Sequence, residues 1–156
     1  MSEPEVTAPL IVGMGNPMRS DDGVGPWIAQ RLAAAGHRAC SHSADGTGLI
    51  ELMAGAPRAI VIDAMRSGVT PGTVLRIAAR TVPVPTGSFH YSSHAFGLAE
   101  AIETARALGG LPPDLTVIGI EGRDFGFGEA LSQPVAAAAD RLAAELAHHP
   151  LDVEAM

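Results

Sequence analysis

Short apolar runs alternate with helix-length segments along this chain, and the alternation restricts its fold more than any other feature. The clearest runs are residues 9–14 (PLIVGM), 59–62 (AIVI) and 115–120 (LTVIGI). Continuous apolar runs of this length, closed by glycine or polar residues, are typical of buried parallel strands. Residues 94–108 and 134–148 repeat apolar positions at the helical period and are bounded by proline or glycine. The chain therefore has the pattern of an α/β protein.

Weaker signals complete the order of elements. Residues 26–35 and 49–54 predict helices, residues 38–43 predict a strand, and residues 72–77 alternate as an edge strand does. The order β-α-β-α-β-β-α-β-α predicts a three-layer αβα sandwich, with a mostly parallel twisted sheet of about five strands and helices on both faces. We expect a single domain over residues 1–156. Ligands of such sheets bind at the carboxyl ends of the strands.

Composition excludes several classes of function. The formal charge is −7, and the ten basic residues are all arginines scattered along the chain, which argues against nucleic acid or an anionic membrane as the partner. The absence of lysine excludes Schiff-base, pyridoxal-phosphate and P-loop chemistry. One cysteine allows no internal disulfide, and no apolar segment reaches the roughly 20 residues of a membrane span. We expect a cytoplasmic protein.

The first turn, Gly13-Met14-Gly15, begins like a dinucleotide-binding fingerprint. The third glycine of that fingerprint is missing, and the acidic pair Asp21-Asp22 stands where a pyrophosphate would bind. Carboxylates at that position repel phosphate. A nucleotide-binding Rossmann-like domain is therefore only a minor alternative. No GxSxG, HExxH or GxxxxGK[ST] motif is present either.

Polar residues follow the predicted strands, which places them at one edge of the sheet. Asp21 and Asp22 follow the first strand, Asp45 the second and Asp63 the AIVI run, and His94 precedes the long helix. Because these positions are far apart in sequence, they would meet only if several loops converge on that edge. Two carboxylates and one imidazole suit a divalent ion such as nickel, zinc, manganese or iron, with positions left for substrate or water.

Each of these residues also has a structural interpretation. Asp21 or Asp22 could cap the helix that begins near residue 26. His94 could be satisfied locally by Ser92 or Ser93. A carboxylate at the end of a buried strand, as expected for Asp63, must be paired, coordinated or desolvated at a cost of several kcal/mol. The residues alone leave these alternatives open.

Several motifs, in order, resemble those of the [NiFe]-hydrogenase maturation endopeptidases, which trim the C-terminal extension of a hydrogenase large subunit. They are IVGMGNPMRSDDGVGPWIAQRL, the DGTG loop beginning at Asp45, VIDAMRSGVTPGT, SSHAFGLAEAI and VIGIEG. The resemblance extends over about residues 10–146. Each motif is only suggestive by itself, but their joint order is specific.

The resemblance implies roles for individual residues. The family's nickel ligands match three residues of this chain. Asp22 matches the acidic residue of the first turn, Asp63 the aspartate of the middle strand, and His94 the histidine at the start of the long helix. Asp22 and Asp63 would also be catalytic, in an endopeptidase that the family classes as aspartic. Some relatives carry glutamate at the first position, so Asp22 reaches less far. The candidates for binding the substrate backbone are Asn16, Asp45, Gly46 and Thr47, with Thr47 standing in for a glycine of the family's DGGT loop.

The implied substrate is a [NiFe]-hydrogenase large-subunit precursor after nickel insertion. The resemblance implies that the Ni²⁺ is supplied by that precursor, and another divalent ion could replace it. The alternative from another class is a non-catalytic, nickel-dependent assembly factor that binds the large subunit without cutting it. Both would use the same ligands.

Overall fold

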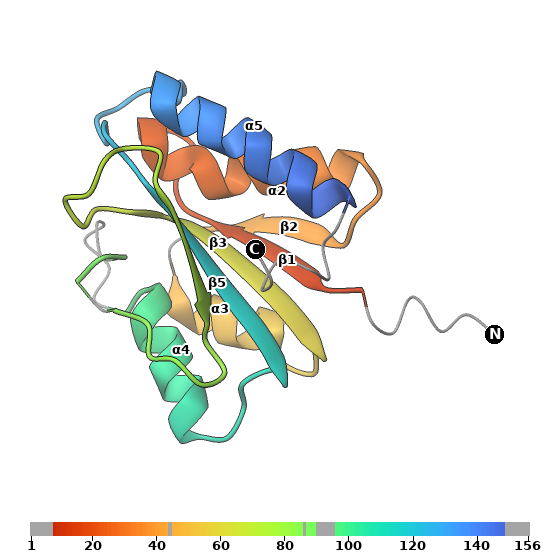
Figure 1. The fold of residues 1–156 in the computed structure, drawn as a ribbon. Helices are drawn as coiled ribbons and strands as arrows, with labels where there is room; N and C mark the ends of the chain where they lie inside the picture. Colours follow the sequence, from red (N-terminus) through yellow and green to blue (C-terminus); the bar gives the residue numbers. More distant parts are fainter. Residues whose placement is uncertain (1–7, 44, 86, 90–95, 149–156) are drawn as a thin grey trace.

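A five-stranded sheet lies between two layers of helices in the computed structural model, which describes residues 8–43, 45–85, 87–89 and 96–148 (Figure 1). The strand order is β2-β1-β3-β5-β4; the first four are parallel, and β4 is antiparallel to β5. The strands are β1 (Leu10–Met14), β2 (Ala39–His42), β3 (Arg58–Met65), β4 (Val74–Ala78) and β5 (Asp114–Glu121). The predicted three-layer, mostly parallel architecture is confirmed, including the edge position of β4.

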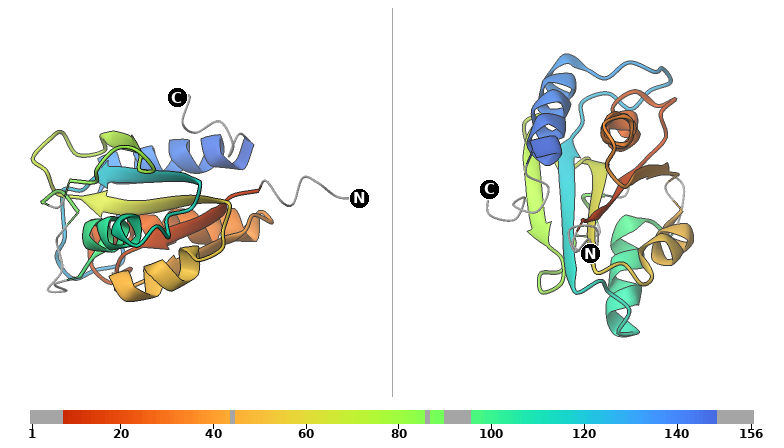
Figure 2. Two further views of the ribbon diagram at one scale, coloured as in Figure 1. Left: turned by 90° about the horizontal axis from the view of Figure 1, so that it is seen from below. Right: turned by 90° about the vertical axis from the view of Figure 1, so that its right-hand side faces the viewer.

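Helices cover both faces of the sheet. Helices α2 and α5 lie side by side on one face, and α3 and α4 on the other (Figures 1 and 2). The helical elements are η1 (Ser20–Gly23), α2 (Val24–Ala34), α3 (Gly46–Met53), α4 (Leu98–Ala107) and α5 (Gln133–His148). The 3-10 turn η1 was not predicted. None of the helices in the described ranges is both long and apolar enough to cross a lipid bilayer.

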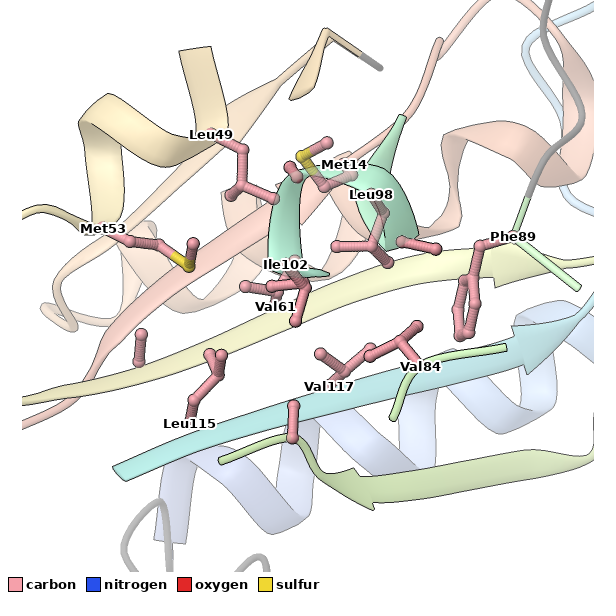
Figure 3. Packing of buried hydrophobic residues seen from close by; sticks show 14 of the residues in the cluster. Met14, Leu49, Met53, Val61, Val84, Phe89, Leu98, Ile102, Leu115 and Val117 are labelled. Atoms are coloured by element: carbon pink, nitrogen blue, oxygen red, sulfur yellow. The ribbon is translucent and has the colours of Figure 1, made fainter. Parts of the chain in front are cut away.

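The core has two parts, one on each face of the sheet. Under α3 and α4, Leu49 and Ile102 pack onto Val61 and Val117 of the central strands (Figure 3). Under α2 and α5, the intervening strand residues belong to a second buried cluster that includes Ile62. Because β3 and β5 are buried on both faces, their sequences are mostly apolar at successive positions rather than alternating. Full burial of each large aliphatic side chain contributes about 1.5–3 kcal/mol.

Two close backbone approaches hold the first helix against the end of β1. A Cβ atom on Gly13 would lie 2.0 Å from the carbonyl oxygen of Gly25, so α2 packs directly on the strand backbone. Gly15 has φ +136°, and a Cβ there would lie 2.0 Å from the carbonyl oxygen of Asp22. The glycines of the first turn thus bring η1 back over the end of β1. This packing accounts for them without a bound nucleotide.

Candidate active site

Two buried carboxylates, Asp22 of η1 and Asp63 of β3, form an acidic pair at the carboxyl edge, where β1, β2, β3 and β5 end. The turn η1 contacts β3, and the two aspartates are 8% and 6% exposed. Asp63 shares a strand face with Val61, the face covered by α3 and α4. Asp63 was expected to end its strand. That expectation is wrong, because β3 continues to Met65 in register with β5.

The environment of the acidic pair disfavours negative charge. Burial raises the pKa of Asp63 well above its ordinary value of 3.8, and the neighbouring charge of Asp22 raises it further. Burial also raises the pKa of Asp22, against the opposing effects of the Asn16 N–H and the Arg19 charge. Among the described residues, each carboxylate accepts one backbone hydrogen bond, from Asn16 N to Asp22 Oδ2 at 2.9 Å and from Ala64 N to Asp63 Oδ1 at 2.8 Å. These bonds do not offset the cost of burial. A cation or a shared proton would relieve the repulsion.

The carboxylate of Asp21, the residue before Asp22, forms hydrogen bonds that hold the fold together. It accepts hydrogen bonds from the backbone N–H groups of Arg123, Asp124 and Ser132 at 2.8, 2.9 and 2.7 Å, and from the Ser132 hydroxyl at 2.7 Å. Helix α2 has Gly23 as its N-cap and no side-chain capping bond. The helix-cap interpretation is therefore wrong for both aspartates. Asp21 instead fastens the loop between β5 and α5 to η1.

The predicted substrate-binding loop forms the start of α3. Asp45 is its N-cap, and Asp45 Oδ1 accepts from Thr47 N at 3.1 Å. Gly46 is buried, and its N–H donates to the carbonyl of Phe96 at 3.0 Å, immediately before α4. Asp45 and Thr47 remain exposed at the carboxyl edge. No hydrogen bond described in the structured ranges joins this loop directly to the acidic pair.

His94, the third predicted metal ligand, lies outside the described residues, so its role stays a prediction. The described chain resumes at Phe96, whose carbonyl is bound to Gly46 at the carboxyl edge. Among the residues that the structure describes, no three His, Cys, Asp or Glu side chains gather closely enough to hold a metal ion. Two of the three predicted ligands, Asp22 and Asp63, lie next to each other. Their carboxylate oxygens are hard donors, and the imidazole predicted for His94 is what would shift the ligand set toward a borderline ion such as nickel or zinc.

Beside Asp21, Asp22 and Asp63, the edge holds one more buried carboxylate that the sequence analysis did not single out. Glu121 ends β5, opposite Met65, and is 3% exposed. Its oxygens accept from the Ser67 N–H at 3.1 and 3.0 Å, the Ser67 hydroxyl at 2.7 Å and the Gly68 N–H at 3.0 Å. Glu121 thereby fixes the loop that follows β3. The sequence held a signal for Glu121, because it directly follows the apolar run LTVIGI just as Asp63 follows AIVI.

Comparison with known proteins places this arrangement in a family. The family profile described as hydrogenase maturation protease matches residues 43–149. "Hydrogenase expression/formation protein HupD" of Rhodobacter capsulatus is 32% identical over 125 residues, covering 75% of this chain and 60% of the relative. "Hydrogenase expression/formation protein HoxM" of Azotobacter vinelandii is 31% identical over 140 residues, covering 85% and 68%. The chain thus spans only 60% to 68% of the length of these relatives.

Solved structures share the fold. The [NiFe] hydrogenase maturation protease HybD from Thermococcus kodakarensis superposes with a TM-score of 0.71 at 25% identity, covering 92% of this chain and 99% of that one. The hydrogenase maturating endopeptidase HybD from E. coli gives a TM-score of 0.64 at 23% identity, covering 91% and 93%.

Fold and site together define a three-layer α/β protein with buried acidic residues at the carboxyl edge of its sheet. The chain belongs to the hydrogenase maturation protease family. The resemblance found in the sequence motifs is thereby confirmed. The segment matched by the family profile, residues 43–149, includes Asp45, Asp63 and His94, whereas Asp22 lies before it.

Proposed function

We propose that this protein is an endopeptidase that removes the C-terminal extension of a [NiFe]-hydrogenase large-subunit precursor after nickel insertion. The observation that carries the proposal is the acidic pair: Asp22 and Asp63 are buried next to each other at the carboxyl edge, where ligands of α/β sheets bind. Membership of the hydrogenase maturation protease family supports the same substrate class.

Nickel enters this proposal as part of the substrate. Asp22 and Asp63 are neighbouring buried carboxylates, and their negative charges repel each other. A precursor without its metal brings no positive charge to relieve this repulsion. A nickel-loaded precursor supplies the missing positive charge, and Asp22, Asp63 and His94 complete its ligand set. The differential affinity makes cleavage conditional on metal insertion.

Peptide hydrolysis requires an activated water and a polarised carbonyl. Nickel held against the acidic pair would polarise the scissile carbonyl or lower the pKa of a bound water. The proposed general base that takes the proton of that water is Asp63, whose raised pKa suits proton acceptance, with Asp22 as the other candidate.

Two segments at the carboxyl edge are the candidates for binding the substrate backbone. Asn16 is exposed, and its side chain is fixed because Oδ1 accepts from the Met18 N–H at 2.9 Å. Asp45 and Thr47 at the start of α3 are exposed at the same edge, above the buried Gly46. These groups would hold the extended chain on either side of the scissile bond.

The proposal is tested by the intact mass of a nickel-loaded large-subunit precursor after incubation with the purified protein. We expect the precursor to lose one C-terminal peptide with the wild-type protein and to remain uncut with His94→Ala. A stable complex with an unchanged C-terminus would contradict the peptidase and favour the assembly factor. Trimming by His94→Ala at the wild-type rate would remove His94 from the site.

A further inference from the structure

The most exposed large apolar side chain of the described residues lies beside the candidate active site. Phe127, in the loop between β5 and α5, is 88% exposed, and Met18 of the first turn is 52% exposed. The two segments are joined by hydrogen bonds from Gly128 N to the Met18 carbonyl at 2.8 Å and from Ser20 N to the Gly128 carbonyl at 2.7 Å. We call Met18, Arg19 and Phe127 the aromatic platform.

The platform is held in place although it faces solvent. Asp21 fastens the loop through its four hydrogen bonds, and the Ser20 hydroxyl donates to the Gly126 carbonyl at 2.9 Å. The Arg19 guanidinium lies 4.7 Å from the centroid of the Phe127 ring. An exposed aromatic ring on an anchored loop is preorganised for a partner, which reduces the entropy lost on binding.

The platform is continuous with the acidic pair. Met18 and Arg19 belong to the same turn as Asn16 and Asp22, and the Asn16 side chain accepts from Met18 N. Arg19 is close enough to Asp22 for its charge to act on that carboxylate. The turn that carries Asp22 also carries part of the platform, so a precursor bound at the acidic pair would have the Phe127 ring beside it.

We propose that the aromatic platform is the docking surface for the large-subunit precursor, which buries an apolar side chain against Phe127. The inference rests on the proposed function, because the precursor is its occupant. Aromatic anchors of this kind carry a large share of the binding energy at protein interfaces. Phe127 is then a specificity residue that acts on substrate affinity rather than on the chemical step.

The test compares wild type, Phe127→Ala and Leu108→Ala. Leu108 is the matched control, because it is 77% exposed but caps the end of α4, away from the acidic pair. Binding of nickel-loaded precursor is measured by biolayer interferometry and processing by initial rates, with light scattering of each free variant. We expect Phe127→Ala to raise both Kd and KM about tenfold with kcat nearly unchanged, and Leu108→Ala to match wild type.

The outcomes separate this inference from the proposed function. Wild-type values of Kd and KM for Phe127→Ala would overturn the docking surface and leave the peptidase intact. Wild-type binding without cleavage, weakened by Phe127→Ala, would support the docking surface and overturn the peptidase. If the wild type is a dimer and Phe127→Ala is a monomer, the platform binds a second copy of this chain and the inference is overturned. A wild-type protein that neither binds nor cuts the precursor would also overturn it.

Discussion

Replacing Asp63 by asparagine is expected to abolish processing and to stabilise the protein at the same time. The asparagine oxygen can still accept the 2.8 Å hydrogen bond from Ala64 N, but the amide carries no charge for nickel and cannot take a proton from water. We expect the processing rate to fall by about 10³-fold or more. Removing a buried charge that is repelled by Asp22 should add about 1–3 kcal/mol to the free energy of unfolding near neutral pH.

The pH dependence follows from the direction of the pKa shift. Because the pKa of Asp63 is raised in the folded state, its ionised form lowers stability above that pKa. As pH falls through the raised pKa toward 3.8, Asp63 takes up a proton in the folded protein before it does so in the unfolded chain. The folded wild type therefore regains stability over this pH range. The advantage of Asp63→Asn in chemical denaturation should therefore shrink on acidification. A less stable variant at pH 8, or one that still processes the precursor, would contradict this account of Asp63.

Asp21→Asn is expected to behave in the opposite way to Asp22→Asn, although the residues are neighbours. The Asp21 carboxylate accepts four hydrogen bonds on two oxygens, so an amide would point its NH₂ group at donors. The loss of charge-assisted bonds at a fully buried site should lower the free energy of unfolding by about 2–4 kcal/mol.

The matched variant Asp22→Asn removes a charge whose burial is unfavourable, so its stability should stay within about 1 kcal/mol of wild type or rise. Its processing rate should nevertheless collapse. Guanidinium unfolding and precursor processing on both variants check the contrast. Equal destabilisation by the two substitutions would show that the structural and functional roles are not divided between Asp21 and Asp22 as described.

The strands and helices could be predicted because local pattern determines them. Continuous apolar runs marked β3 and β5 as strands covered on both faces, and the alternation over residues 72–77 marked β4 as an edge. The edge of the sheet that carries the site followed from topology alone. The 3-10 turn η1 was missed because it depends on the positive φ of Gly15 and on close backbone packing, neither of which has a periodic signal.

The division of labour between Asp21 and Asp22 could not be predicted. The donors that bind Asp21 lie more than 100 residues later in the chain, so only the folded structure brings them together. Asp22 and Asp63 meet for the same reason. The aromatic platform could not be predicted either. In the sequence, Phe127 is one apolar residue of a glycine-rich segment. Its exposure depends on how Asp21 anchors that loop in the folded structure.

We propose that the acidic pair recognises a cation that the substrate carries. This proposal is tested most directly by incubating the wild-type protein with nickel-loaded and nickel-free forms of the same precursor and following the mass of the large subunit over time. We expect the nickel-loaded form to lose its C-terminal peptide and the nickel-free form to stay full length. Equal trimming of both forms would contradict the proposal.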